Sequence, residues 1–366
     1  MTNTSNFIRT VLNGLLCDNP LCEKCGRIVA RNNNNTHHPI EQHGTCKTEE
    51  ESRATSRRPL SSAKITLLMQ SVKNFIPKLS CRNSKGECGR IGVFGGATLY
   101  TGAPYLAAIS ALRCGADMLH IFCTKEAGPV LRGFCPDMLI HPNLDQEYGL
   151  VELDAWLPLL DCVVLGHGLG HSQHMVARVA ILMEKIRQYN IPVVIDGDGL
   201  LCAMKNPDIV RNYPRAVLTP NADELVTLAQ IVLCRTVDKN ICPDGDIVQE
   251  IANGLGNLTV IQKGATDLIS NGNLTEECYT AGSPRRCGGQ GVILSGVLAT
   301  FLSWAYREEH CQELNLSVLA GWGACSLVRE CAEQGFRKCG RGMTAEDMIQ
   351  RIDIEFRRLF ESETFF

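Results

Sequence analysis

Short apolar stretches that end beside a glycine constrain the fold of this chain more than any other feature. They occur at 90–96, 162–170, 192–197 and 258–264, and a similar stretch at 216–221 ends in Pro-Asn. Continuous apolar runs of this length suit strands that are buried on both faces of a sheet. Segments with helical apolar spacing follow most of them. This repetition of strand, turn and helix predicts an α/β fold with a mostly parallel sheet and helices on both faces.

The first part of the chain, residues 1–62, differs in composition from the rest. It contains the run Asn32–Asn35 and many Ser, Thr, Arg and Glu residues without an apolar period. Such a segment buries too little apolar surface to offset the entropy lost on ordering, which predicts disorder. Residues 63–362 are predicted to form one folded domain.

Two alternative interpretations of residues 1–62 stay open. Residues 7–16 have apolar side chains at helical spacing, with Arg9 among them and no acidic residue before Asp18, as in a weak mitochondrial presequence. The predicted location is therefore cytoplasmic or mitochondrial. Cys22 and Cys25 have the spacing of zinc ligands, but the histidines that follow are irregularly spaced and no apolar core is near, which favours free thiols.

Composition narrows the classes of partner. The formal net charge is −3 with no basic stripe, which disfavours nucleic acid. No apolar run approaches the length that crosses a bilayer, so no membrane partner is expected. The chain has 19 cysteines, and those after residue 80 lie in apolar patterns where Cys serves as a small hydrophobe, which favours a reducing compartment. Composition does not decide between a monomer and a homo-oligomer.

The glycine-rich turn 282–291 is the strongest candidate for a binding site. Three of the four residues 288–291 are glycine, and residues 292–306 have the apolar spacing of a helix. The start of a helix presents unpaired N–H groups and the positive end of the helix dipole, and both favour a bound phosphate. Arg285 and Arg286 would add charge-assisted hydrogen bonds to phosphate oxygens. A plain helix cap is the alternative.

Two carboxylates, Asp196 and Asp198, follow the apolar stretch 192–195. Mg²⁺ favours one or two carboxylates together with substrate phosphates, so both are candidate metal ligands, directly or through water. Either could instead cap the next helix. The chain has no Walker A sequence, and 166–170 lacks the acidic residue expected about 20 residues beyond a dinucleotide fingerprint. A standard nicotinamide oxidoreductase is therefore disfavoured.

Taken together and in order, these segments resemble the ATP-dependent NAD(P)H-hydrate dehydratase family. The resemblance covers roughly residues 63–360. It is carried by Gly95-Gly96, Tyr100–Pro104, Gly168–Gly170, Ile195–Leu200, Leu218–Asn221 with Glu224, Gln262–Gly264 with Asp267, Arg285–Gly291, Gly323–Leu327 and Met343–Met348. The resemblance implies a ribokinase-like three-layer α/β/α fold with a mostly parallel central sheet.

The resemblance also implies a metabolite-repair reaction that uses ATP, to which the candidate ligands Asp196 and Asp198 would add Mg²⁺. The S epimers of NADHX and NADPHX, which are NADH and NADPH hydrated at C6 of the nicotinamide ring, would be phosphorylated on the added hydroxyl and would then lose phosphate. By position, the hydrate would contact Gly168, Asn221, Ala222, Asp223, Glu224, Leu225, Val226 and Thr227. ATP would contact Lys263, Gly264, Ala265, Thr266, Asp267, Gly282, Ser283, Pro284, Arg285, Arg286, Cys287, Gly288, Gly289, Gln290 and Gly291. The backbone amides of the turn, around Gly289 and Gly291, would stabilise charge on the transferred phosphoryl group.

The chain departs from the family pattern at the centre of this turn. The family's turn ends in Asp, the expected base for the attacking hydroxyl, whereas this chain has Val292. Valine cannot accept a proton, and general-base assistance typically contributes about 10²–10⁴-fold, so weakened turnover is expected. His167 stands where the family usually has Pro, and Gly197 where it often has Ala. His167 either contacts a phosphate or is tolerated loop variation.

Two other functions stay open beside a working dehydratase. Val292 favours a catalytically silent binder of the hydrate or of ATP. Another small-molecule kinase on the same fold is the second alternative. Against that kinase, the residues Thr219–Asn221 and the Arg285–Gln290 turn favour the hydrate over a sugar or a vitamin precursor.

Overall fold

The computed structural model describes residues 61–170, 172–235, 237, 245–307 and 316–361. The chain divides into two compact units, Met1–Ser61 and Ser62–Phe366, and the structure below is that of the second. The predictions of disorder, a presequence or a zinc site in residues 1–60 lie outside the described residues.

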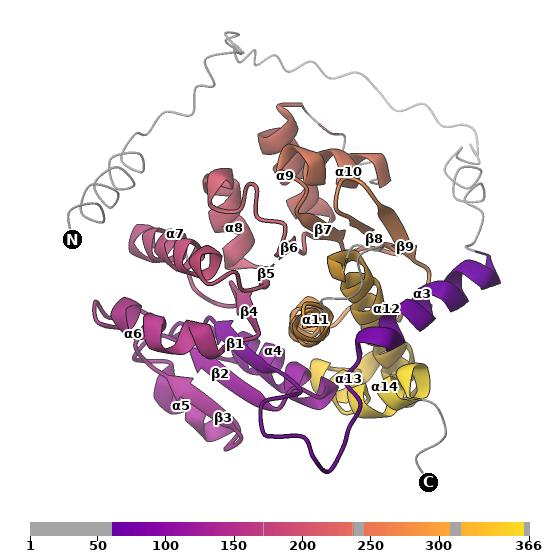
Figure 1. Ribbon diagram of the computed structural model, residues 1–366, viewed down its shortest axis with the longest axis horizontal. Helices are drawn as coiled ribbons and strands as arrows, with labels where there is room; N and C mark the ends of the chain where they lie inside the picture. The colour runs from indigo at the N-terminus through magenta and orange to yellow at the C-terminus, as the bar shows by residue number, and fades with distance from the viewer. Residues whose placement is uncertain (1–60, 171, 236, 238–244, 308–315, 362–366) are drawn as a thin grey trace, which may run out of the picture. The chain divides into compact units, whose positions relative to one another are not determined.

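Nine strands form one sheet (Figure 1). They are β1 Arg90–Phe94, β2 Met118–Phe122, β3 Met138–His141, β4 Cys162–Leu165, β5 Val193–Ile195, β6 Ala216–Leu218, β7 Thr259–Gln262, β8 Asp267–Ser270 and β9 Thr275–Cys278. Their order across the sheet is β3-β2-β1-β4-β5-β6-β7-β8-β9. Strands β1 to β7 are parallel, and β8 and β9 are added antiparallel. The predicted mostly parallel sheet is confirmed, and its order reverses between β1 and β4, where such sheets bind ligands.

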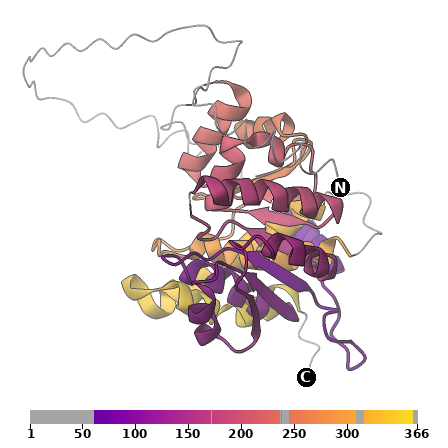
Figure 2. The same cartoon turned by 90° about the vertical axis from the view of Figure 1, so that its left-hand side faces the viewer.

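Helices cover both faces of the sheet (Figures 1 and 2). They are α3 Ser62–Phe75, α4 Gly102–Cys114, α5 Gly128–Phe134, α6 Gly149–Trp156, α7 Gln173–Gln188, α8 Asp198–Lys205, α9 Ala222–Leu233, α10 Gly245–Gly254, α11 Gln290–Ala305, α12 Leu316–Cys339, α13 Ala345–Ile349 and α14 Ile352–Phe360. On one face α4, α11 and α12 pack together against the strands, with α3, α13 and α14 outside them. Helices α6 to α10 line the other face. This is the predicted three-layer α/β/α architecture.

Helix α11 is the central element of its layer and is seen end-on in Figure 1. Every residue from Ile293 to Ala305 is buried. At Gly296 an added Cβ would lie only 2.0 Å from the carbonyl oxygen of Ala107, so the backbones of α11 and α4 are in direct contact there. Each aliphatic side chain that α11 buries contributes roughly 1.5–3 kcal/mol. The packing therefore fixes α11, and with it the start of the helix.

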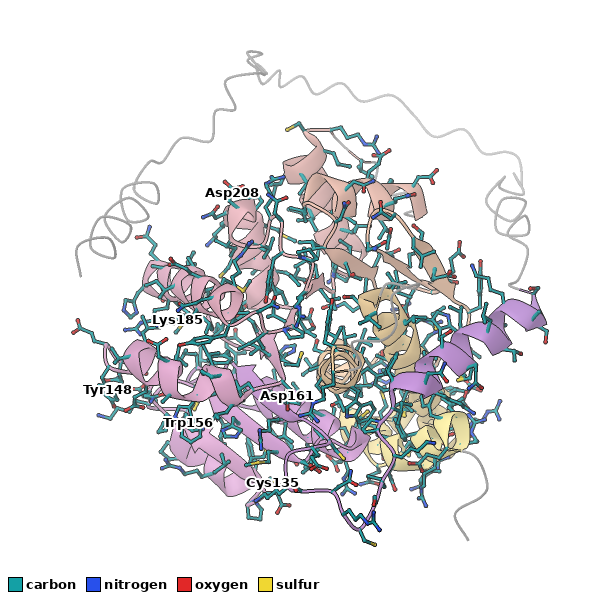
Figure 3. All side chains as sticks on the ribbon, in the orientation of Figure 1. Cys135, Tyr148, Trp156, Asp161, Lys185 and Asp208 are labelled. Atoms are coloured by element: carbon teal, nitrogen blue, oxygen red, sulfur yellow. The ribbon has the colours of Figure 1, made fainter. Side chains whose placement is uncertain are left out.

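Aromatic rings stack across the edge of the sheet formed by β1, β2 and β3. The rings of Phe94 and Phe122 lie 4.3 Å apart, and His141 stacks on Phe122 at 4.4 Å. Trp156, labelled in Figure 3 at the end of α6, meets His141 edge-on at 4.6 Å. This cluster joins α6 to the sheet.

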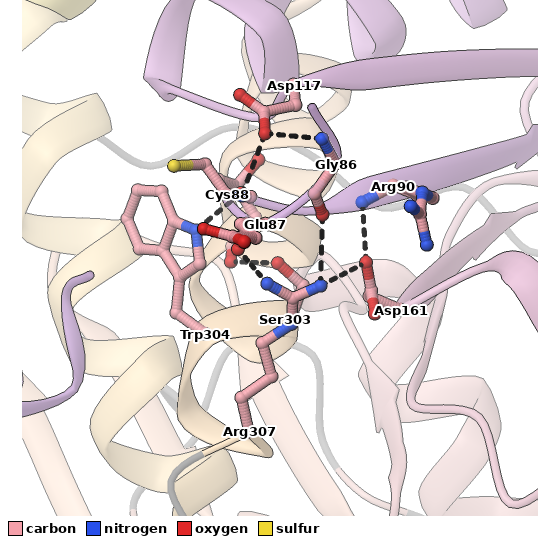
Figure 4. A network of polar contacts seen from close by, with 10 residues as sticks. Gly86, Glu87, Cys88, Arg90, Asp117, Asp161, Ser303, Trp304 and Arg307 are labelled. Atoms are coloured by element: carbon pink, nitrogen blue, oxygen red, sulfur yellow. Dashed lines mark hydrogen bonds and ion pairs between the residues drawn. The ribbon is translucent and has the colours of Figure 1, made fainter. Parts of the chain in front are cut away.

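A polar network fastens the amino-terminal ends of the strands (Figure 4). Asp161 accepts hydrogen bonds from the backbone N–H of Arg90 and from the guanidinium of Arg307, both at 2.8 Å. Asp117 accepts from the amides of Gly86 and Cys88 at 2.8 and 2.9 Å. The network ties the loop before β1 to the carboxyl end of α11. It lies at the opposite end of α11 from the glycine turn.

The cysteines of the described residues are free thiols, and most are buried among apolar side chains. Burial raises the pKa of Cys202 to about 11, and that of Cys123 to about 12, so these thiols stay protonated at neutral pH. Within the described residues, the helices are too short or too polar for any of them to cross a bilayer.

Candidate functional site

The carboxyl ends of the parallel strands bring the predicted motifs together. At the switch point, the amide of Gly96 after β1 donates to the carbonyls of His167 and Gly168 after β4, at 2.9 and 3.1 Å. Gly168 has φ of 68°, and an added Cβ would lie 2.5 Å from the Cβ of Tyr100. Glycine is therefore required at 168, because the loop after β4 lies directly against the loop that leads into α4.

The glycine turn opens onto the start of α11, as predicted. Gly289 is the N-cap with φ of 95°, and an added Cβ would lie 3.0 Å from Leu106 and from Ala345. Within the described residues, the amides of Gln290, Gly291 and Val292 have no backbone acceptor, whereas Ile293 donates to Gly289 at 2.9 Å. The mouth of α11 thus offers the unpaired N–H groups and the positive dipole end that favour an anion.

A buried ion pair lies beside this mouth. Lys263 follows β7 and Asp196 follows β5, and Lys263 Nζ lies 2.8 Å from Asp196 Oδ1. Ser295, one turn into α11, donates from Oγ to Asp196 Oδ2 at 2.9 Å. An added Cβ on Gly291 would come within 3.2 Å of Lys263 Nζ, so the ammonium group lies against the first turn of α11. An ammonium group therefore lies where a phosphate is predicted, with Asp196 as its counter-charge.

The charge of Asp196 is set by these neighbours. Burial alone would raise the pKa of its carboxyl group, but Lys263, His167 and the hydrogen bonds from Lys263 and Ser295 outweigh burial and hold the pKa below its ordinary value. Asp196 is therefore ionised, with Oδ1 paired to Lys263 and Oδ2 accepting from Ser295. An ionised, paired carboxylate is a weak proton acceptor.

His167 lies beneath the same group. Its side chain is 3% exposed, and its Nε2 has no hydrogen-bond partner within the described part of the chain; the Oδ2 atom of Asp196 is 4.0 Å away. Burial lowers the pKa of His167, and Lys263 lowers it further, against an opposing effect of Asp196. The ring is therefore neutral near pH 7 and faces the interior.

The residues predicted to bind the hydrate lie at Gly168 and in the first turns of α9. Asn221 caps α9: its Oδ1 accepts from the amide of Glu224 at 2.9 Å, and Glu224 Oε2 accepts from the amide of Asn221 at 2.7 Å. Ala222, Asp223 and Thr227 are exposed, whereas Leu225 and Val226 are buried in the core. Burial raises the pKa of Glu224, against the hydrogen bond from Asn221 and the charge of Lys263.

A cavity of about 660 Å³ opens at the glycine turn. Of the residues predicted to contact ATP, all line this cavity except Thr266, Arg285 and Gly288. Asn221, predicted to contact the hydrate, lines it too. The structure thus places both predicted ATP segments, 263–267 and 282–291, around one space.

One wall of the cavity was missed by the sequence reasoning. Cys325, Val328, Arg329 and Ala332 lie on one face of α12, at the spacing of successive helical turns, and Met348 of α13 extends this wall. The wall is apolar apart from Arg329. The spacing of these residues could have indicated a shared face, but only if residues 316–339 had first been recognised as a helix.

The two candidate metal ligands differ in their surroundings. Asp196 is engaged by Lys263 and Ser295, and Asp198, the first residue of α8, accepts from the amide of Gly170 at 2.8 Å. The cap of α8 is Gly197, so neither Asp acts as its N-cap. Three or more His, Cys, Asp or Glu side chains gather nowhere in the described ranges in a way that could hold a metal ion.

Comparison with known proteins shows which proteins this chain is similar to. Residues 91–353 match the protein family described as NAD(P)H-hydrate dehydratase. The ATP-dependent (S)-NAD(P)H-hydrate dehydratase of Mus musculus is 43% identical over 295 residues, which are 80% of this chain and 85% of the mouse protein. The protein of that name in Homo sapiens is 43% identical over 314 residues, 85% of this chain and 90% of the human protein. That of Danio rerio is 41% identical over 305 residues, 83% and 92% of the two chains.

Solved structures of lower identity share the fold. A ribokinase-like superfamily protein from Enterococcus faecalis is similar with a TM-score of 0.66 at 18% identity, over 80% of this chain and 95% of that one. An ADP/ATP-dependent NAD(P)H-hydrate dehydratase from Bacillus subtilis, co-crystallised with ATP and Mg²⁺, is similar with a TM-score of 0.61 at 19% identity, over 80% and 97% of the two chains. These similarities confirm the predicted ribokinase-like fold.

Proposed function

The chain belongs to the NAD(P)H-hydrate dehydratase family, and from this premise we propose that it dehydrates the S epimers of NADHX and NADPHX at the expense of ATP. The products are NADH or NADPH, ADP and phosphate. The observation that carries the proposal is the cavity at the mouth of α11, because both predicted nucleotide-binding segments line it beside the ammonium group of Lys263.

The chemistry explains why ATP is needed. Hydroxide is a poor leaving group, so direct loss of water from the hydrated ring is slow. Transfer of the γ-phosphoryl group to the ring hydroxyl makes a phosphate ester, whose C–O bond then breaks with phosphate carrying the electron pair away. Loss of a proton from the adjacent ring carbon restores the double bond. Phosphoryl transfer depends mainly on positioning and on electrostatic stabilisation, which a helix start and an ammonium group supply.

The cavity suggests how ATP lies. The phosphates would sit at the amides of Gln290 and Gly291, within reach of Lys263, because that end of the cavity carries the positive charge. The adenine base would lie against the apolar wall of α12, where Val328 and Ala332 offer flat, uncharged surface. Arg286 lines the same cavity and would neutralise phosphate charge.

The hydrate would approach from the switch point of the sheet. Gly168 and the start of α9 lie at carboxyl ends of strands, as does Lys263, so a ring bound there can present its hydroxyl to the γ-phosphoryl group. Of the predicted contacts, the buried Leu225 and Val226 would act by shaping the start of α9 and not by touching the ligand.

Mg²⁺ is proposed to enter with ATP. Asp196 is a poor metal ligand as it stands, because Lys263 and Ser295 occupy its oxygens. Mg²⁺ at sites of this kind is held largely by substrate phosphates and water with one or two carboxylates. Asp198, which is half-buried and accepts from the amide of Gly170, would reach the ion through water. When bound, the ion would neutralise phosphate charge.

Val292 favours a second candidate function, that of a binder with little or no turnover. It is half-buried in the first turn of α11, one turn before Ser295. The valine side chain cannot take the proton of the attacking hydroxyl. The nearby Asp196 is a weak acceptor because Lys263 lowers its pKa. We therefore propose a slow enzyme, with the silent binder as the alternative.

One assay separates these functions. Purified protein is mixed with ATP, Mg²⁺ and NADHX, and absorbance in the reduced-nicotinamide band is followed together with release of ADP and phosphate. A slow, ATP-dependent rise with equal amounts of NADH and ADP supports the dehydratase. Binding of ATP or NADHX by calorimetry without any rise identifies the silent binder. Failure to bind either ligand would contradict the proposed function.

A further inference from the structure

Arg329 is the one charged residue on the cavity-lining face of α12 within the described chain, and its guanidinium group contacts the loop that follows β7. Nη1 donates to the carbonyl of Gly264 at 3.3 Å and to Asp267 Oδ2 at 3.1 Å. Nη2 donates to the carbonyl of Ala265, and Nε donates to the carbonyl of Thr280. The guanidinium group thus donates four hydrogen bonds, three to backbone carbonyls and one to the carboxylate of Asp267.

The same guanidinium group also lies at the entry to the glycine turn. Thr280 precedes the turn by two residues, and an added Cβ on Gly282 would lie 3.3 Å from Nη2 of Arg329. One side chain therefore spans the two segments, 263–267 and 282–291, that surround the nucleotide cavity. The antiparallel pairing of β8 with β9 sets Asp267 opposite Cys278 and so brings the ends of the two segments near each other. Arg329 then fixes the loops beyond these ends relative to one another.

The contacts of Asp267 make the connection rigid. Its Oδ2 is held by Arg329, and its Oδ1 accepts from the amide of Gly264 at 2.9 Å. Side-chain exposure is 15% for Arg329 and 9% for Asp267, so water screens the pair little. A lysine could not replace this arginine, because an ammonium group lacks the planar fork that reaches several acceptors at once.

We propose that Arg329 is a positioning residue that holds the two ATP-binding segments in their binding geometry. The proposal rests on the proposed function, since it assumes that the cavity binds ATP. Without the guanidinium group, each segment must be ordered when the nucleotide binds, and the cost of that ordering is subtracted from the affinity. The hydrate contacts other residues, so its affinity should be unaffected.

The test compares Arg329→Met and Arg329→Lys with a matched control on the same helix, Arg337→Met. Arg337 is exposed and pairs with Glu333 in the preceding turn of α12. Calorimetry with ATP should show a dissociation constant raised by about 10-fold or more in both Arg329 variants and unchanged in the control. The KM for NADHX should stay within about twofold in all three.

Three results would overturn the proposal. An unchanged ATP affinity in Arg329→Met would show that the segments need no connector. Equal losses of affinity for ATP and for NADHX would indicate general distortion. Failure of methylguanidinium to restore ATP affinity to Arg329→Ala would show that the missing group is not the cause. If the unchanged protein itself does not bind ATP, the proposed function fails first, which is a separate result.

A milder variant guards against misfolding. Gly282→Ala places a methyl group about 3.3 Å from Nη2 and displaces the guanidinium tip without removing it. We expect ATP affinity to fall by roughly 3-fold while the melting temperature stays unchanged, because the shift is small. Unchanged ATP affinity in this variant would also count against the role of Arg329.

Discussion

Val292 occupies the first turn of α11, where we propose that the phosphates bind, and its side chain is therefore proposed to limit the rate of the reaction. A carboxylate at this position would lie near the positive end of the helix dipole and close to the ammonium group of Lys263, which both favour its ionised form. The nearby charge of Asp196 opposes ionisation and raises the pKa of such a carboxylate toward the range that suits a general base.

The variant Val292→Asp is therefore expected to raise kcat by about 10²–10⁴-fold, with little change in the KM for ATP. Val292→Asn is the matched control, because asparagine can hydrogen-bond the hydroxyl but cannot take its proton. Steady-state rates with NADHX and ATP would check both. If Val292→Asp is no faster than the unchanged protein, the assigned role of this position is wrong.

Lys263 pairs with Asp196 and is proposed to bind ATP as well, and these two roles can be separated. Replacing it with Ala removes the positive charge at the mouth of α11, and we expect calorimetry to show weaker binding of ATP. The same change leaves a buried, ionised Asp196 without its partner, which typically costs about 3–5 kcal/mol. Lys205→Ala, an exposed lysine on α8, is the control.

A second substitution separates the two roles of Lys263. In Lys263→Ala/Asp196→Asn no unpaired charge remains, so the free energy of unfolding should recover much of its loss while ATP binding stays weak. Full recovery of ATP binding in the double variant would show that Lys263 acts on the nucleotide only through Asp196. Unchanged ATP affinity in Lys263→Ala would remove residues 263–267 from the nucleotide site.

Among the elements, the strand pair β2 and β3 carries a coupled histidine pair. His120 Nδ1 and His141 Nε2 are 3.1 Å apart, so one hydrogen serves both nitrogens. Burial, together with a smaller effect of the nearby His120, lowers the pKa of His141 to about 4. Burial also lowers the pKa of His120, with a smaller contribution from Arg90.

This pair should make stability depend on pH. Between about pH 6.5, the ordinary histidine pKa, and about pH 4, His141 is protonated in the unfolded chain but not in the folded one. This histidine therefore leaves the free energy of unfolding unaffected above the window and lowers it as the pH falls through the window. Urea unfolding at about pH 7.5 and about pH 5 should show a lower midpoint at the acidic value.

The variant His141→Gln checks this assignment. Glutamine keeps a hydrogen-bonding partner for His120 but cannot be protonated, so the drop in midpoint between the two pH values should shrink. His174→Gln, an exposed histidine on α7, should leave the drop unchanged. Equal drops in the unchanged protein and in His141→Gln would contradict the assignment to this pair.

Some helices and strands could be predicted from the sequence and others could not. Strands β1, β4, β5 and β7 were predicted because each is a continuous apolar run, which signals burial on both faces. Strand β9 was missed, since Thr275–Cys278 is short and three of its four residues are polar. Helix α12 was missed as well: Gly321 and Gly323 interrupt its apolar pattern, yet these glycines are required because an added Cβ would meet Ile261 or Phe301 at under 3 Å.

Without the family resemblance, spacing alone predicted the candidate site only where it is local in sequence. The glycine turn and the start of α11 follow each other in the chain, so the phosphate site was inferred from spacing alone. The pairing of Lys263 with Asp196 joins residues 67 positions apart, and Arg329 reaches Asp267 across 62 positions. Such contacts depend on the order of the strands and on how α12 packs, which local patterns do not encode.

At the scale of the whole molecule, stability should come from the unit that begins at Ser62. Helix α14, near the carboxyl end of the chain, contributes to this stability by packing on α11. Phe360 packs on Phe301 at a ring distance of 5.4 Å, and Phe356 packs on Trp304 at 5.8 Å. Replacing one buried Phe with Ala typically costs about 3–5 kcal/mol. The carboxyl-terminal helix is thus part of the core around α11.

Removing the amino-terminal segment should therefore leave the stability of the domain nearly unchanged, whereas removing the carboxyl-terminal helix should abolish folding. Deletion of residues 1–60 is expected to change the melting temperature by less than about 2 °C, because that segment has the composition of a chain that buries little apolar surface. Deletion from Ile352 onward should prevent folding, since it uncovers Phe301 and Trp304 of α11. Calorimetric melting of both truncated chains checks the pair. A large drop on amino-terminal deletion would mean that residues 1–60 fold onto the domain, and it would overturn the predicted boundary near residue 62.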